Sequence, residues 1–233
     1  MTTVAIISDI HANLSAFQAV LTDIHKHKVS RIYCLGDLVG YYTEPIPTIH
    51  LALARCEVVI KGNHDQAAAL GDIPIHYRND SLPSIELATQ GLTVNERKLL
   101  HGLPLMYTLY LDNHRAMMIH AGPEYPLDQY IYPEDEEDIQ STFDFMELIE
   151  IDVLFLGHTH ISFLKQQDSR IILNPGSVGQ PRDGDNRASY VLFDMESFNT
   201  KFIRVAYDPT QTIAGIKKHH LPLELANRLL AGK

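Results

Sequence analysis

The first part of the chain alternates short apolar runs with stretches in which apolar residues recur at helical spacing. Helices are predicted over about 14–27 and 47–55, because apolar side chains there recur three and four residues apart. Strands that alternate with helices form βαβ units with parallel strands. The pattern therefore predicts an α/β fold, with helices on the faces of a largely parallel sheet. Three apolar runs are the predicted strands of this unit: 4–8, 31–35 and 57–60.

The pattern changes at residue 66. From there to about 114 the chain is helix-like and broken by prolines and a glycine, which predicts a helical excursion from the core or a cap over the site. We expect one domain over residues 1–233. A strand, a helix through Phe143 and a further strand follow, and the remaining apolar runs predict antiparallel strands before a short C-terminal helix. The strands predicted in this part are 115–119, 153–156, 171–173, 190–193 and 201–205.

Composition and charge narrow the range of partners. Hydrophobic residues make up 45% of the 233, which is enough for a packed core, and the formal net charge is -10. A nucleic-acid duplex is an unexpected partner, because binding its phosphate backbone requires a basic surface. Small phosphorylated substrates remain compatible, since bound cations invert the charge of a site. With no signal peptide and no apolar run of about 18 residues, we expect a cytoplasmic protein without a membrane contact.

Polar clusters follow the predicted strands. Because the carboxyl ends of parallel strands share one edge of a sheet, these clusters are expected to converge. Residues two apart in extended backbone point the same way, so the two residues of an Asp-x-His or His-x-His sequence are expected to face one site together. The clusters are Asp9 and His11, Gly36-Asp37, Gly62-Asn63-His64-Asp65, His120, and Gly157-His158-Thr159-His160.

His64 and Asp65 apart, these clusters supply two carboxylates, one amide and four imidazoles. Oxygen and imidazole ligands without thiolate suit divalent manganese, iron, nickel or zinc. Seven groups are too many for one cation, whereas two cations ~3.5–4 Å apart can share a carboxylate and clamp a phosphoryl group. Taken alone, Asp9 also fits a cap for the helix that begins near Leu14, and a residue such as His120 is more often a half-buried structural histidine than a ligand. Their combination predicts a dinuclear metal site.

The same motifs resemble those of the calcineurin-like metallophosphoesterase superfamily: Ser8-Asp9-Ile10-His11, Gly36-Asp37, Gly62-Asn63-His64-Asp65, Ile119-His120 and Gly157-His158-Thr159-His160. The segment Asn174-Pro175-Gly176-Ser177-Val178-Gly179-Gln180-Pro181-Arg182 resembles the small bacterial and archaeal phosphodiesterase group of that superfamily, to which diadenosine tetraphosphatases are related. The likeness runs from about Val4 to Val205. It implies a four-layer α/β sandwich of mixed sheets flanked by helices.

The resemblance also implies roles for the residues. One metal would be held by Asp9, His11, Asp37 and His160, and the other by Asp37, Asn63, His120 and His158. His64 would act beside the phosphate as a proton donor or a stabiliser of charge, with Asp65 orienting its ring. The implied reaction is attack of a metal-activated hydroxide on a phosphodiester or nucleotide polyphosphate, such as diadenosine tetraphosphate or a cyclic nucleotide. The alternatives are a phosphomonoesterase or protein phosphatase, and a non-catalytic interaction module of the same fold.

Three features remain open between a functional and a structural interpretation. Arg182 and Arg187 either grip a substrate phosphate or pair with a neighbouring aspartate to hold a loop. Tyr41 and Tyr42 either stack on a nucleobase or pack in an ordinary loop, and packing is favoured. The acidic run at 134–138 is predicted to begin a helix rather than to bind metal, because carboxylates complement the positive end of the helix dipole.

Overall fold

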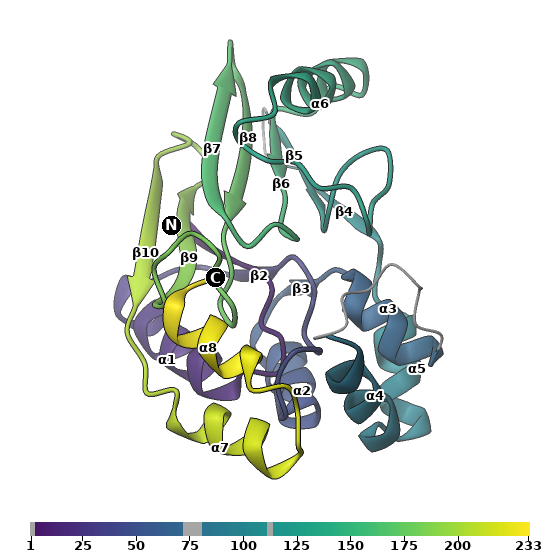
Figure 1. Cartoon of the computed structure of the whole chain (residues 1–233). Helices are drawn as coiled ribbons and strands as arrows, with labels where there is room; N and C mark the ends of the chain where they lie inside the picture. Colours follow the sequence, from purple (N-terminus) through teal and green to yellow (C-terminus); the bar gives the residue numbers. More distant parts are fainter. Residues whose placement is uncertain (1–2, 72–80, 111–113) are drawn as a thin grey trace.

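The computed structural model describes residues 3–71, 81–110 and 114–233. Two five-stranded sheets pack against each other, and helices lie outside them (Figure 1). The first sheet has the order β10-β9-β1-β2-β3, with β1 (Thr3–Ile7), β2 (Ile32–Cys34), β3 (Val58–Val59), β9 (Ala188–Asp194) and β10 (Thr200–Val205). The second has the order β4-β5-β6-β8-β7, with β4 (Met106–Tyr110), β5 (Arg115–Ile119), β6 (Val153–Phe155), β7 (Ser162–Gln167) and β8 (Arg170–Pro175).

Each sheet is mixed. β1, β2 and β3 are parallel, as are β5, β6 and β8, whereas β9, β10, β4 and β7 pair antiparallel to their neighbours. Alternate residues of β1 serve two cores: Val4 and Ile6 pack between the sheets, and Ala5 and Ile7 pack toward the helices. This alternation produces four layers, helix, sheet, sheet and helix, and it confirms the predicted sandwich of mixed sheets.

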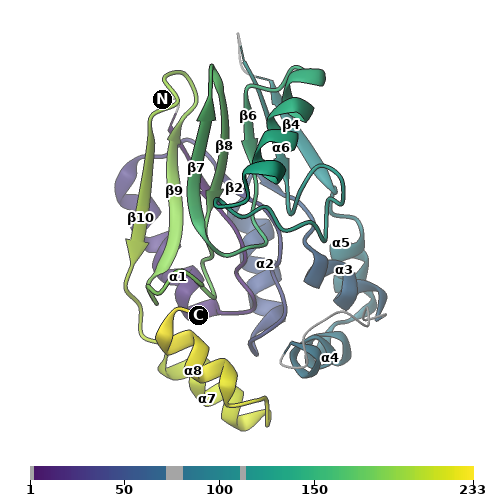
Figure 2. The same cartoon turned by 45° about the horizontal axis from the view of Figure 1, so that its top comes forward.

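The helices cover the outer faces. The first sheet is covered by α1 (Leu14–Ile24) and α2 (Pro45–Arg55), and the second by α6 (Glu136–Leu148). At the C-terminus, α7 (Thr210–Lys218) and α8 (Glu224–Ala231) lie side by side, as Figure 2 shows from another angle. Among the described residues, no helix has both the length and the apolar character needed to cross a membrane.

Local capping decides two of the questions that the sequence leaves open. Asn13 is the N-cap of α1, because its side chain accepts a hydrogen bond from the backbone N–H of Ala16 at 3.3 Å, so Asp9 is left for another role. At α6, Asp135 accepts from the N–H of Asp138 at 3.2 Å, which confirms that the acidic run begins a helix. The helix predicted over 14–27 is α-helical only to Ile24 and ends in the 3-10 turn η1 (His25–His27).

The excursion predicted at 66–114 is helical in its described first part, with α3 (Asn63–Leu70), α4 (Leu82–Gly91) and α5 (Val94–His101). Residues 72–80 and 111–113 of this segment lie outside the described residues. The prediction is wrong for 106–110, which forms β4 at the edge of the second sheet beside β5. The strand β7 was not predicted either, because its apolar residues are few and it is completed by pairing with β8.

Candidate metal centre

The candidate ligands come from both sheets. Asp9 and His11 follow β1, Asp37 follows β2, and Asn63 follows β3 at the start of α3. His120 follows β5, and His158 and His160 follow β6. Sequence reasoning placed all of them at the edge of one sheet, whereas the structure brings together the carboxyl ends of parallel strands from two sheets. Backbone hydrogen bonds tie the loops in pairs, from Asp9 N to Gly36 O at 3.0 Å and from Gly157 N to His120 O at 2.8 Å.

The backbone at five of the seven candidate ligands is left-handed rather than extended. The values of φ are 54° at Asp9, 53° at His11, 53° at Asp37, 66° at His158 and 62° at His160. The expectation that Asp9 and His11, and likewise His158 and His160, converge through extended backbone is therefore wrong. Non-glycine residues in this region store roughly 1–3 kcal/mol each and persist only where the surrounding structure enforces them. Their concentration at the candidate ligands indicates a functional constraint.

The first group of ligand atoms is compact and buried. The Nε2 atoms of His11 and His160 lie 3.0 Å apart. Asp9 Oδ1 lies 3.3 Å from His160 Nε2 and 3.8 Å from His11 Nε2. All three residues are at most 2% exposed. Three donor atoms thus converge on one point in the interior.

The second group lies beside the first. His120 Nε2 is 3.1 Å from Asn63 Oδ1 and 3.4 Å from Asp37 Oδ2. The ligand atoms of Asp37, His120 and His158 lie within 4.8 Å of one another. The same Asp37 Oδ2 is 3.7 Å from His11 Nε2, so this oxygen lies between the two groups. The carboxylate of Asp37 therefore contacts both groups of candidate ligands.

Hydrogen bonds at the far side of three rings fix which nitrogen faces the centre. The Nδ1 atoms of His11, His120 and His160 lie 3.0, 2.7 and 2.6 Å from the carbonyl oxygens of Val39, Leu35 and Gln180. A carbonyl only accepts, so each Nδ1 carries a proton and donates it. In a neutral ring this leaves an unprotonated Nε2 facing inward, which is the arrangement of a metal-binding histidine.

Two further observations fit a bound cation. The buried atoms Asp9 Oδ1 and His158 Nε2 have no hydrogen-bond partner among the residues that the structure describes, although buried polar atoms ordinarily have one. The donors are nitrogen and oxygen without thiolate, which suits manganese, iron, nickel and zinc. Among the described residues, three sets of His and Asp side chains are spaced to hold an ion: Asp9, His11 and His160; His11, Asp37 and His64; and Asp37, His120 and His158.

The charges in the cluster also favour cations. Burial raises the pKa of Asp9 and of Asp37, but nearby histidines outweigh it and hold both below their usual range. Burial lowers the pKa of His120, yet the charge of Asp37 and its hydrogen bond raise it to about 9. Burial lowers the pKa of His158 to about 3. Two ionised carboxylates thus face one protonated imidazole, and a bound metal would replace that proton.

Glycines permit the close approach of the loops. Gly40 has φ +90°, and a Cβ there would collide with Nδ1 of His64. A Cβ at Gly62 would collide with Oδ1 of Asp37. The ring of His64 therefore occupies space that any other residue at position 40 would fill. The positions of His64 and Asp37 therefore require glycine, which has no Cβ, at residues 40 and 62.

His64 and Asp65 lie beside the ligands but make different contacts. His64 is 5% exposed, and the centroid of its ring is 4.8 Å from that of His11. The carboxylate of Asp65 accepts hydrogen bonds from the backbone N–H groups of Leu38 at 2.9 Å, Val39 at 3.4 Å and Gly62 at 3.0 Å. Asp65 therefore joins the loops that follow β2 and β3.

The segment from Asn174 onward holds the ligand loops together. Asn174 Nδ2 donates to the carbonyl of Gly157 at 2.6 Å and to Thr159 Oγ1 at 3.1 Å. Ser177 Oγ donates to the carbonyl of Asp9 at 2.7 Å and accepts from Gln180 N at 2.7 Å. Sequence reasoning used this segment only for the resemblance and missed these contacts. Polar residues directly after an apolar strand were the available signal.

The two arginines separate into different roles. Arg187 is exposed and pairs with Asp185, with Nη2 2.6 Å from Oδ2, so it holds a loop. Arg182 donates from Nη2 to Tyr41 Oη and to Gln180 Oε1, at 2.9 Å each. Its guanidinium lies 5.5 Å from the centroid of the Tyr41 ring, which is 4.6 Å from that of His11. Arg182 thus borders the first group of ligands.

Tyr41 and Tyr42 are packed rather than available to a ligand. Tyr41 is 5% exposed and Tyr42 is fully buried. The Tyr42 hydroxyl accepts a hydrogen bond from Gln180 Nε2 at 3.3 Å. The packing interpretation therefore holds for both.

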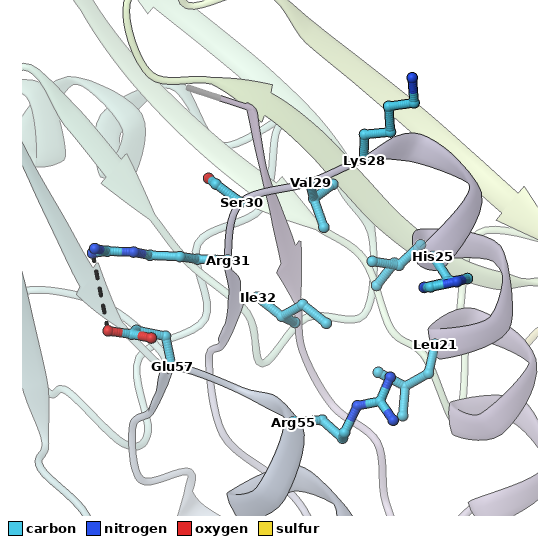
Figure 3. A pocket seen from close by; sticks show the side chains of 10 residues that line it. Leu21, His25, Lys28, Val29, Ser30, Arg31, Ile32, Arg55 and Glu57 are labelled. Carbon is cyan, nitrogen blue, oxygen red and sulfur yellow. Dashed lines mark ion pairs between the residues drawn. The ribbon is translucent and has the colours of Figure 1, made fainter. Parts of the chain in front are cut away.

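A cavity of about 480 Å³ lies elsewhere, beside the N-terminal end of β2 (Figure 3). Apolar residues such as Leu21 and Ile32 line it, together with Lys28, Arg31 and Arg55, and Arg31 pairs with Glu57 at 4.0 Å. Basic side chains are common at helix C-termini, where the dipole is negative, and α2 ends here. The candidate ligands follow the other ends of the strands, so the cavity is separate from the metal centre.

Comparison with known proteins places this site in a family. The model of the calcineurin-like phosphoesterase superfamily domain matches residues 2–197, and the chain belongs to this family. An uncharacterized protein of Methanocaldococcus jannaschii is 36% identical over 247 residues, covering 99% of this chain and 98% of that protein. The crystal structure of a metallophosphoesterase from Sphaerobacter thermophilus has a TM-score of 0.83 at 30% identity, with 100% and 99% of the two chains covered.

A hypothetical protein from Pyrococcus horikoshii has a TM-score of 0.89 at 23% identity, again over 100% of this chain and 99% of that one. At that identity the likeness concerns the fold. Family membership supports a phosphoester hydrolase that uses divalent metals, and it agrees with the His and Asp groups of the centre.

Proposed function

We propose that the protein hydrolyses phosphodiester or nucleotide polyphosphate bonds at a pair of divalent cations. The observation that carries this proposal is the position of Asp37 Oδ2, 3.7 Å from His11 Nε2 and 3.4 Å from His120 Nε2. One carboxylate shared by two groups of donors is the arrangement needed to hold two cations a few ångströms apart. Membership in the calcineurin-like superfamily supports the same reaction class.

The two cations would be held by overlapping sets of residues. When bound, they supply a water of lowered pKa as nucleophile and neutralise charge on the phosphoryl oxygens. The backbone carbonyls of Val39, Leu35 and Gln180 keep three of the imidazoles in the ligating tautomer. The first set is Asp9, His11, Asp37 and His160, and the second is Asp37, Asn63, His120 and His158.

His64 is the proposed catalytic group beside the phosphate. Burial lowers its pKa to about 4, so its ring is neutral at pH 7 in the free protein. A neutral imidazole still carries one N–H, which can donate a hydrogen bond to the leaving oxygen as charge develops there. The negative charge of a bound phosphate raises the proton affinity of the ring and favours proton donation. Asp65 is a positioning residue, since it holds the backbone next to His64.

Arg182 is the proposed contact for a substrate phosphate. Its guanidinium is oriented by Tyr41 and Gln180, whereas that of Arg187 pairs with Asp185. A guanidinium held in this way retains a positive charge at the edge of the first ligand group. Charge-assisted hydrogen bonds to phosphate are about twice as strong as neutral ones.

The test is the His64→Ala variant, with His219→Ala as the control because His219 is exposed on the C-terminal segment. Both variants and the wild type are loaded with manganese, nickel, iron or zinc, and metal content is measured by elemental analysis. We expect His64→Ala to keep two metals per chain and to lose about 100-fold or more in kcat on an alkyl ester with a poor leaving group. The loss should be smaller on bis-p-nitrophenyl phosphate, whose leaving group requires little protonation.

Wild-type activity on an alkyl diester in His64→Ala would remove the assigned role. The substrate panel also includes cyclic nucleotides, dinucleoside polyphosphates, phosphoproteins and monoesters. Preference for a monoester or phosphoprotein would replace the diesterase proposal with a phosphomonoesterase. Metal uptake without hydrolysis of any of them would indicate a non-catalytic module of the same fold.

A further inference from the structure

The loop between β5 and α6 brings aromatic side chains to the metal centre. The centroid of the Tyr130 ring lies 4.1 Å from that of His158, one of the candidate ligands. The ring of Tyr132 lies parallel to that of Tyr130, within 6°, with centroids 5.8 Å apart. At this separation parallel rings are offset, so each covers only part of the other's face. Tyr130 remains 44% exposed despite both contacts.

The loop that presents these rings is anchored. Ile131, between the two tyrosines, is 1% exposed and packs with Ile119 and Phe143 in the core under α6. The N–H of Asp135 donates to the carbonyl of Tyr132 at 3.2 Å. Burial of Ile131 fixes the chain at this point, so Tyr130 and Tyr132 are directed away from that core. An aromatic surface beside the centre is therefore part of the built structure.

The surroundings of the two ligand groups differ. Arg182 borders the first group through Tyr41, whose ring contacts that of His11. Tyr130 borders the second group through His158. A phosphoryl group placed between the two sets of ligands would have a cationic side chain toward one side and an aromatic surface toward the other. A substrate that carries an aromatic group on one side of its phosphate fits this asymmetry.

We propose that Tyr130 and Tyr132 form a stacking platform for the nucleobase of the substrate. The proposal rests on the proposed function, and it selects nucleoside phosphoesters over aliphatic ones among the substrates considered there. Every nucleobase has a π-face, so the platform favours a base without choosing one. Tyr41 and Tyr42, the two tyrosines considered for base stacking in the sequence, are buried. Tyr130, in the loop after β5, is exposed and can contact a base.

The test compares two ligands that differ in the base. Adenosine 5′-monophosphate and ribose 5-phosphate are titrated calorimetrically into manganese-loaded protein, after metal content has been measured. The variants are Tyr130→Ala and Tyr130→Phe. The control is Tyr110→Ala: Tyr110 is 78% exposed and pairs with Arg115, at the far end of β5 from His120.

We expect the wild type to bind the nucleotide roughly five- to a hundredfold more tightly than the sugar phosphate, the range that base–aromatic stacking gives. Tyr130→Ala should bring this ratio close to one, whereas Tyr130→Phe and Tyr110→Ala should keep it. Equal affinities in the metal-loaded wild type, or an unchanged ratio in Tyr130→Ala, would overturn the platform and leave the proposed function standing. Protein that takes up no metal would overturn the proposed function, and the platform with it.

Discussion

Ser177 offers a sharp test of how the ligands are held, because it is not itself a ligand. Its side chain is fully buried and donates to the carbonyl of Asp9 at 2.7 Å. It also accepts from the N–H of Gln180 at 2.7 Å, and the carbonyl of Gln180 accepts from His160 Nδ1 at 2.6 Å. One hydroxyl therefore links the backbone of one ligand to the residue that orients another.

The effect of Ser177→Ala can be worked out from these contacts. The carbonyl of Asp9 keeps a second partner, because Gly179 N donates to it at 2.9 Å. Gln180 N loses its partner, and an unpaired buried donor costs about 1–3 kcal/mol. We expect the metal-free variant to lose about 2 kcal/mol in the free energy of unfolding. Groups that orient metal ligands change metal affinity by about 10- to 100-fold when removed, and we expect a loss in that range.

Two measurements separate these effects. Urea unfolding of metal-free protein gives the stability, and calorimetric titration of manganese gives the affinity. Ser84→Ala is the matched control, since Ser84 is fully buried in α4 and its hydroxyl donates to the carbonyl of Ser81 at 2.6 Å. The control should lose stability and keep its metal affinity. If Ser177→Ala bound manganese as tightly as the control, the proposed link between the hydroxyl and the ligands would be wrong.

The remaining predictions concern metal content and substrate affinity. Asp37→Asn should reduce bound metal from two per chain toward none, because Asp37 Oδ2 contacts both groups of donors; elemental analysis that still finds two would contradict a bridging role. Arg182→Ala should raise KM about tenfold or more through loss of a charge-assisted hydrogen bond, whereas Arg187→Ala, whose guanidinium is paired with Asp185, should leave KM unchanged. Steady-state kinetics on one diester measure both, and a larger effect at Arg187 would reverse the assignment.

Much of the local structure was predictable from the order of the residues. The strand predicted at 115–119 has those bounds in the structure. The clusters that follow β1, β2, β3, β5 and β6 were found because a polar residue directly after an apolar run is visible along the chain. The caps of α1 and α6 are local in the same way.

Other features depend on contacts between segments far apart in the sequence. Residues 106–110 form β4 because β5 offers an edge to pair with, which the segment itself does not reveal. The exposure of Tyr130 and the burial of Tyr41 are decided by what packs over each ring. A tyrosine has the same intrinsic properties in both places, so the sequence alone does not show which ring is exposed beside the centre.

The sequence by itself determined which side chains are offered at the strand ends and in what order. The tertiary structure decided how they meet: two sheets pack face to face, and left-handed backbone at residues such as Asp9 and His158 turns the side chains inward. That conformation is unfavourable for an isolated residue with a Cβ. It is held here by hydrogen bonds between the loops, which exist only when the sheets are assembled.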